Sequence, residues 1–196
     1  MKALKQKVVE HIMSCNALQM NPDGLVLDSG LLNGIFIAES IASYIQSFDM
    51  EYEVVLGLGD VYSEGLSEIV CNELQSRGES CTRKVEHSNR VILVTTEIES
   101  IEEIQRVKSR IIEKGGVVVG LFELLDNQRN IDNHTIANQL PFECGFSAFP
   151  VITFEDLIKH AYGSFKHYLM DYWTKQCICD IGVLCKEHDC VCSTPT

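Results

Sequence analysis

Arg90-Val91-Ile92-Leu93-Val94 is the stretch that decides the fold, because this apolar run leads into an amphipathic helix. Apolar residues recur at helical spacing from Ile101 to Ile112, and Gly115-Gly116 ends that helix. Val117-Val118-Val119-Gly120-Leu121-Phe122 follows as a second apolar run, of the kind found in strands that are buried on both faces. Strand, helix and strand in this order predict a parallel βαβ unit.

Similar patterns continue upstream of this unit. Glu53-Val54-Val55-Leu56-Gly57-Leu58 is another short apolar run, and residues 81–85 are predicted to form a further short strand. We expect helices over residues 1–15, 32–45 and 66–77, where apolar residues again recur at helical spacing. The alternation predicts an α/β fold with a mainly parallel sheet flanked by helices.

The C-terminal part is predicted to contain a loop, a strand and a long helix. The polar residues from Asp126 to Gln139 lack a clear period, which is typical of a loop. Phe149-Pro150-Val151-Ile152 is predicted to be the last strand. Thr153 and Asp156 then form a capping box for a helix that extends to Tyr172.

Composition narrows the class of protein. The 196 residues include 16 Lys and Arg against 28 Asp and Glu, which gives a net charge of -12. Nucleic acids and anionic membranes bind positive surfaces, so neither is expected as a partner. No apolar run approaches the ~18 residues of a membrane span, and the polar first residues do not resemble a signal peptide. We therefore expect a cytoplasmic protein.

Cysteine is the unusual component, because five of the nine cysteines lie in the last twenty residues. We expect one domain over residues 1–174 and a short cysteine-rich tail over 175–196. Such crowding indicates a metal site, with zinc expected, and the alternative is a tail of reduced thiols or labile disulfides. The candidate ligands are Cys177, Cys179, Cys185, His188, Cys190 and Cys192. The other cysteines, Cys15, Cys71, Cys81 and Cys144, are expected to be small core residues.

The candidate ligand site follows from the predicted sheet. Ligands of open parallel sheets bind beyond the carboxyl ends of the strands. Two such ends are predicted, at residues 56–60 and 94–100. They supply the candidate ligand-binding residues Gly57, Gly59, Asp60, Thr95, Thr96, Glu97, Glu99 and Ser100.

Several stretches resemble the type I phosphoribosyltransferases, most closely the orotate phosphoribosyltransferases. Leu27-Asp28-Ser29-Gly30 is similar to the family's substrate-region stretch around a Ser-Gly pair, which implies Ser29 as a further candidate ligand-binding residue. Val54-Val55-Leu56-Gly57 is similar to the strand before the family's pyrophosphate loop. Arg83-Lys84 resembles the basic pair that opens the catalytic loop. Residues 91–120 resemble the strand, loop, helix and strand of the phosphoribosyl diphosphate (PRPP) site, and residues 149–157 resemble the family's C-terminal end. The resemblance implies a magnesium-dependent transferase and a homodimer.

The chain departs from that family where PRPP would bind. The family's acidic pair is replaced by Thr95-Thr96, and its glycine-rich turn by Glu97-Ile98-Glu99-Ser100-Ile101-Glu102-Glu103. Two like charges about 4 Å apart repel by about 4 kcal/mol at an effective dielectric of about 20, and four carboxylates crowd here. Ser100 and Glu103 are also expected to form a capping box, which would satisfy the helix's own N–H donors. Asp28 replaces the family's lysine.

We therefore interpret the chain as a phosphoribosyltransferase-like protein without transferase activity, a pseudoenzyme that binds a protein partner or a small ligand. One alternative is an active, divergent orotate-type transferase that uses PRPP and magnesium, with Arg83 and Lys84 as candidate catalytic residues. Another alternative is a metal-binding or redox protein that acts through its C-terminal cysteines.

Overall fold

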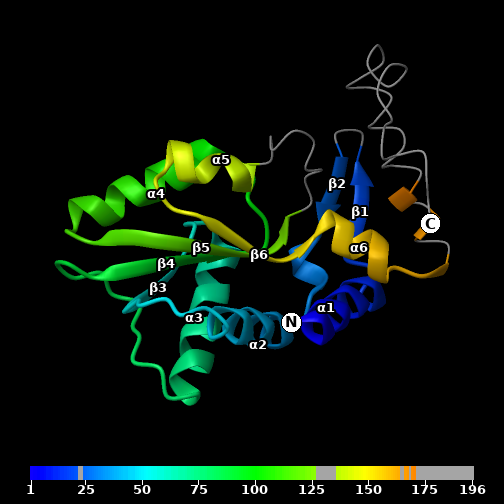
Figure 1. Ribbon diagram of the computed structural model, residues 1–196, viewed down its shortest axis with the longest axis horizontal. Helices are drawn as coiled ribbons and strands as arrows, with labels where there is room; N and C mark the ends of the chain where they lie inside the picture. The colour runs from blue at the N-terminus through cyan, green and yellow to red at the C-terminus, as the bar shows by residue number, and fades with distance from the viewer. Residues whose placement is uncertain (22–23, 127–135, 164–165, 168, 171–196) are drawn as a thin grey trace, which may run out of the picture.

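The computed structural model describes residues 1–21, 24–126, 136–163, 166–167 and 169–170, and its centre is a four-stranded parallel sheet (Figure 1). The strand order is β3-β4-β5-β6, so each strand pairs with the next in the chain. The predicted mainly parallel α/β fold is confirmed. The strands are β3 Val54–Gly57, β4 Arg90–Thr95, β5 Val117–Asp126 and β6 Ala148–Thr153.

Helices cover both faces of this sheet (Figure 1). Helices α1, α2 and α3 pack on one face, and α4 and α5 pack on the other. A sixth helix lies beside the first, where Lys5 Nζ is 2.6 Å from a carboxylate oxygen of Asp156. The helices are α1 Lys2–Ser14, α2 Gly34–Ile45, α3 Val61–Ser76, α4 Ile101–Glu113, α5 Ile136–Glu143 and α6 Phe154–His160.

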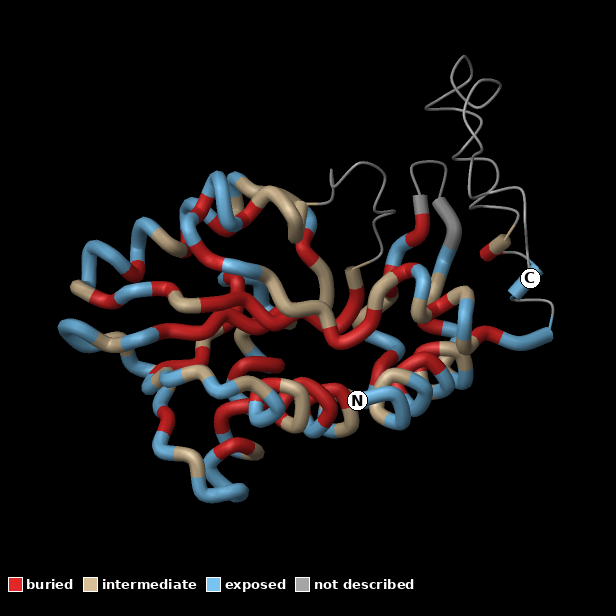
Figure 2. The backbone as a smooth tube through the Cα atoms, viewed as in Figure 1, coloured by how far each residue is buried: buried red, intermediate tan, exposed pale blue. Residues whose placement is uncertain are grey.

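The two-sided covering explains why the strands are apolar runs rather than alternating patterns. In β4, Ile92 and Val94 belong to the core beneath α2 and α3. Val91 and Leu93 belong to the core beneath α4. Successive side chains of a strand point to opposite faces, so a strand with helices on both faces buries every residue. Figure 2 shows β3, β4 and β5 buried along most of their length, whereas β6, at the edge of the sheet, is only partly buried.

A separate two-stranded antiparallel sheet precedes the main one, with strands β1 Leu18–Asn21 and β2 Gly24–Leu27. A short 3-10 helix, η1 Ser29–Leu31, follows it. The sequence analysis did not predict this hairpin. The hairpin delivers Leu27 and Ser29 to the carboxyl ends of β3 and β4.

The structure corrects three predicted elements between residues 61 and 139. The loop at 126–139 is wrong at both ends: Asp126 still belongs to β5, and α5 already begins at Ile136 because Leu140 is buried beside α4. The predicted strand at 81–85 is reduced to one bridge, between Thr82 and Val54. Helix α3 begins at Val61, one turn before the predicted start.

The long C-terminal helix is also interrupted. Helix α6 ends at His160, and the next residue, Ala161, has extended backbone with ψ 153°. The capping box that begins the helix is present, since Thr153 and Asp156 each bond the other's backbone N–H. Tyr172, the predicted end of this helix, and the tail at 175–196 lie outside the described residues. Within the described ranges, no helix is long and apolar enough to cross a membrane.

Candidate functional site

A cavity of about 120 Å³ lies where the sequence placed the ligand site, beyond the carboxyl ends of β3 and β4. Six of the nine candidate residues line it; Gly57, Gly59 and Ser100 do not, although they belong to the two loops that form its walls. The lining residues are Leu27, Ser29, Leu58, Asp60, Tyr62, Thr95, Thr96, Glu97, Glu99 and Glu103.

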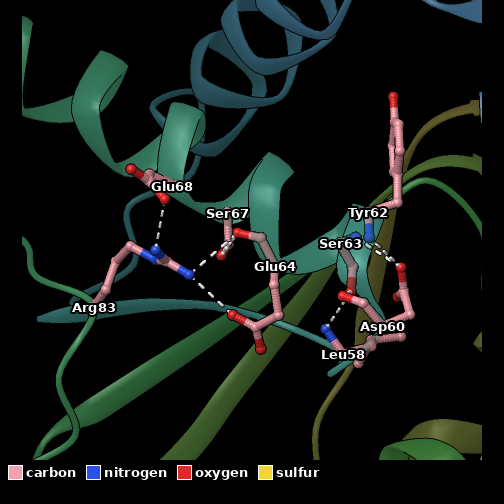
Figure 3. A network of polar contacts seen from close by, with 8 residues as sticks. All are labelled: Leu58, Asp60, Tyr62, Ser63, Glu64, Ser67, Glu68 and Arg83. Carbon is pink, nitrogen blue, oxygen red and sulfur yellow. Dashed lines mark hydrogen bonds and ion pairs between the residues drawn. The ribbon is translucent and has the colours of Figure 1, made fainter. Parts of the chain in front are cut away.

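The first wall is the loop of residues 57–63, which connects β3 to α3. A side chain at Gly57 would place its Cβ only 2.4 Å from the backbone of Ser63, so glycine is required for this close approach. The Ser63 hydroxyl accepts a hydrogen bond from Leu58 N–H at 3.0 Å, which ties the strand end to the first turn of α3 (Figure 3). The loop is therefore held by contacts among its own residues.

Asp60 closes the N-terminus of α3. Its carboxylate accepts hydrogen bonds from the N–H groups of Tyr62 and Ser63, both at 2.8 Å. Partial burial acts to raise the pKa of Asp60, but the hydrogen bonds from Ser63 and Tyr62 outweigh it and lower the pKa below its ordinary value. An ionised side chain thus occupies two of the donors that a helix N-terminus would otherwise offer to an anion.

The second wall is the loop of residues 95–100, which connects β4 to α4. The hydroxyl of the buried Thr95 donates to the carbonyl of Glu97 at 2.9 Å. The carboxylate of Glu97 accepts a hydrogen bond from Leu27 N–H at 3.1 Å, which joins this loop to β2. Ser100 caps α4 by accepting from Glu103 N–H at 3.2 Å. The expected return bond from Glu103 is absent from the described contacts of α4, so the cap is present but the full capping box is not.

The cavity is negatively charged. Four of the lining residues that the structure describes are acidic, and none of those described is Lys or Arg. Burial raises the pKa of Glu103, and the charges of Glu99 and Asp60 raise it further, while Arg106 acts in the opposite direction. These carboxylates are therefore close enough to repel one another across the cavity. Glu102, which the sequence grouped with them, is exposed and does not line the cavity.

Glu123 is a further acidic residue that the sequence analysis missed. It lies in β5, paired in register with Thr95, and only 1% of it is exposed. Among the residues that the structure describes, its Oε1 has no hydrogen-bond partner. Burial, and then the charges of Asp126 and Glu97, raise the pKa of Glu123 well above its ordinary value, although a hydrogen bond from Ile98 N–H acts against them. The signal that would have revealed it is an acid inside the otherwise apolar run 117–125.

The two candidate catalytic residues lie apart from the cavity lining. The Arg83 guanidinium contacts two carboxylates of α3, with Nη2 2.9 Å from Glu64 and Nη1 3.0 Å from Glu68 (Figure 3). Lys84 Nζ lies 3.0 Å from Glu86, and its side chain is 81% exposed. In this arrangement the charge of Arg83 is balanced by α3 rather than offered to a ligand.

The described part of the chain contains no group of three or more His, Cys, Asp and Glu side chains placed to hold a metal ion. This statement covers the carboxylates of the cavity. The predicted zinc ligands of the tail, Cys177 to Cys192 with His188, lie outside the described residues.

No protein-family model matches the sequence, and no curated protein matches it. Solved structures do match the fold. Orotate phosphoribosyltransferase from Francisella tularensis superposes with a TM-score of 0.71 at 12% identity, over 86% of this chain and 94% of that chain. Orotate phosphoribosyltransferase from Mycobacterium tuberculosis, solved in complex with PRPP, has a TM-score of 0.57 at 14% identity, over 79% of this chain and 98% of that one.

A further match, the UMP synthase of Leishmania donovani, has a TM-score of 0.65 at 13% identity. It covers 89% of this chain and 43% of that chain, so this chain spans less than half of that protein. Likenesses at such low identity establish the fold and nothing about activity. The chain has the type I phosphoribosyltransferase fold, most like that of the orotate phosphoribosyltransferases.

Proposed function

We propose that this phosphoribosyltransferase-like chain lacks transferase activity and acts as a binding or regulatory module. The observation that carries the proposal is the lining of the cavity beyond β3 and β4. Asp60, Glu97, Glu99 and Glu103 meet there, and the described part of the lining contains no Lys or Arg. PRPP is a multiply charged anion, and a small cavity with this lining repels it.

The two helix N-termini beside the cavity support the same proposal. A phosphate is held at a helix start by free backbone N–H groups. Asp60 occupies two of these groups at α3, and Ser100 occupies one at α4. The negative charge of Asp60 adds repulsion to the loss of donors, so neither helix start offers an open anion site.

Calorimetric titration of the full chain with PRPP and Mg²⁺ tests the proposal. We expect no heat of specific binding at ligand concentrations up to the millimolar range. Micromolar affinity would contradict the proposal and favour the alternative, an active divergent transferase that uses magnesium to bridge carboxylates and phosphate.

A matched pair of variants tests whether the acids are the cause. Asp60→Asn combined with Glu99→Gln and Glu103→Gln removes three charges from the cavity, and we expect it to bind PRPP measurably. Glu102→Gln combined with Glu113→Gln removes exposed charges of α4 outside the cavity and should leave binding undetectable. Equal behaviour of the two variants would show that the cavity charge does not decide affinity.

We also propose a homodimer, as the resemblance implies. An apolar groove of about 370 Å³ at the start of α3 supports it, because no charged residue lines it in a chain of net charge -12. Its lining residues are Gly34, Val61, Tyr62, Gly65, Leu66 and Ile69. Val61 is 93% exposed, so Val61→Arg should shift the mass measured by light scattering towards a monomer. Ile112→Arg, at an exposed position of α4, is the control that should not.

For the tail, we propose that Cys177, Cys179, Cys185, His188, Cys190 and Cys192 provide the ligands of a zinc ion. This proposal comes from residue type and spacing alone. Elemental analysis after purification under reducing conditions should find about one zinc per chain. Absence of zinc, iron and copper would contradict the proposal. Cys190→Ser combined with Cys192→Ser should lower the metal content, whereas Cys15→Ser should not.

A further inference from the structure

We propose that Cys71 and Cys81 are a redox pair, and that oxidation of the folded chain joins them in a disulfide bond. Their sulfur atoms are 3.6 Å apart. Cys71 lies on α3, and Cys81 lies in the segment that returns from α3 to the edge of the sheet. Among the four cysteines that the structure describes, these are the two whose sulfur atoms are in contact.

The fold brings the two thiols together through several independent contacts. The chain reverses after α3 at Gly78, whose φ of +94° favours glycine. The side-chain amide of Gln75 donates to the carbonyl of Cys81 at 2.7 Å. The next residue, Thr82, donates its N–H to the carbonyl of Glu53 and accepts from Val55 N–H in β3, both at 2.9 Å. Cys81 is therefore held against α3 from both sides, and the thiol contact is not the result of a free loop.

A disulfide requires only a small further movement. Its sulfur atoms are about 2.05 Å apart, so the thiols must approach by roughly 1.5 Å. The four residues between the end of α3 and Cys81, Arg77 to Ser80, are the part of the chain that can adjust without disturbing a helix or strand. The sequence separation of ten residues is long enough to close a ring around the turn.

The covalent step is thiol–disulfide exchange with a small disulfide oxidant such as oxidised glutathione. One protein thiolate attacks a sulfur of the oxidant, forms a mixed disulfide and releases one glutathione thiolate. The second protein thiolate then attacks the protein sulfur of the mixed disulfide and releases the other. The two protein thiols lose two electrons and two protons, and both are recovered in two molecules of glutathione.

Burial makes the reaction selective and slow. Both side chains are nearly inaccessible, and burial together with the neighbouring Cys71 raises the pKa of Cys81 to about 12. The pair therefore reacts during local opening of the 77–81 segment rather than in the closed state. Once formed, the bond fixes to α3 the segment that carries Arg83, which already contacts Glu64 and Glu68.

Peptide mapping of the full chain tests the pair. The reduced protein is oxidised under native conditions with oxidised glutathione, its remaining thiols are alkylated in denaturant, and it is cleaved after glutamate. Because Glu68, Glu73, Glu79 and Glu86 flank the two cysteines, cleavage yields peptides 69–73 and 80–86, each with a single cysteine. We expect these two peptides joined, with a mass two hydrogen atoms below their sum.

Two controls make the result decisive. Oxidation in denaturant should join Cys71 to many different cysteines. A specific pairing with Cys81 under native conditions would then depend on the fold. Cys144→Ala, at another buried cysteine, should leave the joined peptides unchanged, whereas Cys81→Ala should leave Cys71 alkylated. The oxidised protein should also melt about 5 °C higher than the reduced one, since the bond restricts the unfolded chain. Alkylation of both cysteines after native oxidation, or pairing of Cys71 with other cysteines as often as with Cys81, would overturn the proposal.

Discussion

The two loops that form the cavity walls are held in place by different kinds of contact. The loop of residues 57–63 is held by short-range contacts: Gly57 against Ser63, and Asp60 on the N–H groups of the next turn. The loop of residues 95–100 is held mainly by distant parts of the chain, through Leu27 on Glu97 and the buried Glu123 on Ile98. The first loop carries its geometry in its own sequence, whereas the second depends on the assembled sheet.

Two acidic residues, Asp60 and Glu123, also differ in their surroundings and in the direction of their pKa shifts. Asp60 is exposed and its carboxylate accepts from two backbone N–H groups, so its ionised form is favoured and its pKa is lowered. Glu123 is buried beside other carboxylates, so its protonated form is favoured and its pKa is raised. The charged wall of the cavity thus lies next to a strand that buries an acid with a raised pKa. Substitutions in either loop should therefore differ in both size and pH dependence.

The largest effect is expected at Gly57. Gly57→Ala forces a methyl group to within 2.4 Å of the Ser63 backbone, which must move, and we expect unfolding free energy to fall by about 3 kcal/mol. The control is Gly65→Ala, in the interior of α3 with open space around it, which should raise stability by about 1 kcal/mol. Urea denaturation of both variants measures the pair, and equal stabilities would refute the short-range account of this loop.

The next largest effect on stability is expected at the two helix caps, Asp60 of α3 and Ser100 of α4. Asp60→Ala removes a carboxylate that satisfies two N–H groups and should cost about 2 kcal/mol, whereas Ser100→Ala removes one bond and should cost about 0.5–1 kcal/mol. Because the folded pKa of Asp60 is lowered, its contribution is complete above the ordinary pKa and is lost as pH falls through the lowered one.

The pH series separates the two caps. The stability difference between the native chain and Asp60→Ala should narrow in acid, while the difference for Ser100→Ala should stay constant. Thermal melts in matched buffers would measure both. A constant difference for Asp60→Ala would mean that the ionised form is not what caps α3.

Glu123→Gln tests the second loop and should have a smaller effect of opposite sign. The folded pKa of Glu123 is raised, so its contribution to stability is complete below the ordinary value of 4.5 and falls as pH rises towards the folded pKa. Glutamine mimics the protonated acid and does not titrate. We expect the free energy of unfolding of the variant to exceed that of the native chain by about 1 kcal/mol at about pH 8. This difference should disappear near about pH 4. Exposed Glu113→Gln is the control, and a pH-independent effect at Glu123 would contradict the prediction.

The smallest effect is expected on the pKa of Glu103, which is raised by an acidic residue of each wall, Asp60 and Glu99. Glu99→Gln removes one of the charges that raise its pKa, so that pKa should fall by a small amount. Arg106→Gln should raise it by a similar amount, because Arg106 acts in the opposite direction. Titration of the Glu103 carboxyl carbon by nuclear magnetic resonance measures both shifts. Shifts of the same sign would exclude the charge coupling inferred here.

Much of the fold follows from pattern. The strands at 90–95 and 117–126 and the helix at 101–113 agree with the prediction, because buried parallel strands and amphipathic helices differ in the spacing of their apolar residues. The cap at Ser100 was also predictable, since it involves a residue only three positions away. The strand at 18–21 was missed because its alternation of apolar and polar residues is only four residues long.

The candidate site was predicted only in part. Residues at strand ends were recognised because parallel strands place their carboxyl ends together. That Arg83 is bound by Glu64 and Glu68, nineteen and fifteen positions away, could not be read from the spacing of charges. That Asp60 and Glu103 repel across the cavity likewise depends on the distance between two loops that are far apart in the chain.

Local pattern alone was sufficient to establish a parallel α/β chain with acids beyond its strand ends, since periodicity, turns and caps involve residues within a few positions of one another. Assembly of the chain was required to make a cavity from those acids, to bury Glu123 without a partner for Oε1, and to bring the sulfur atoms of Cys71 and Cys81 to 3.6 Å. The reason is that burial and long-range contact are properties of packed layers, and no short window of residues contains them.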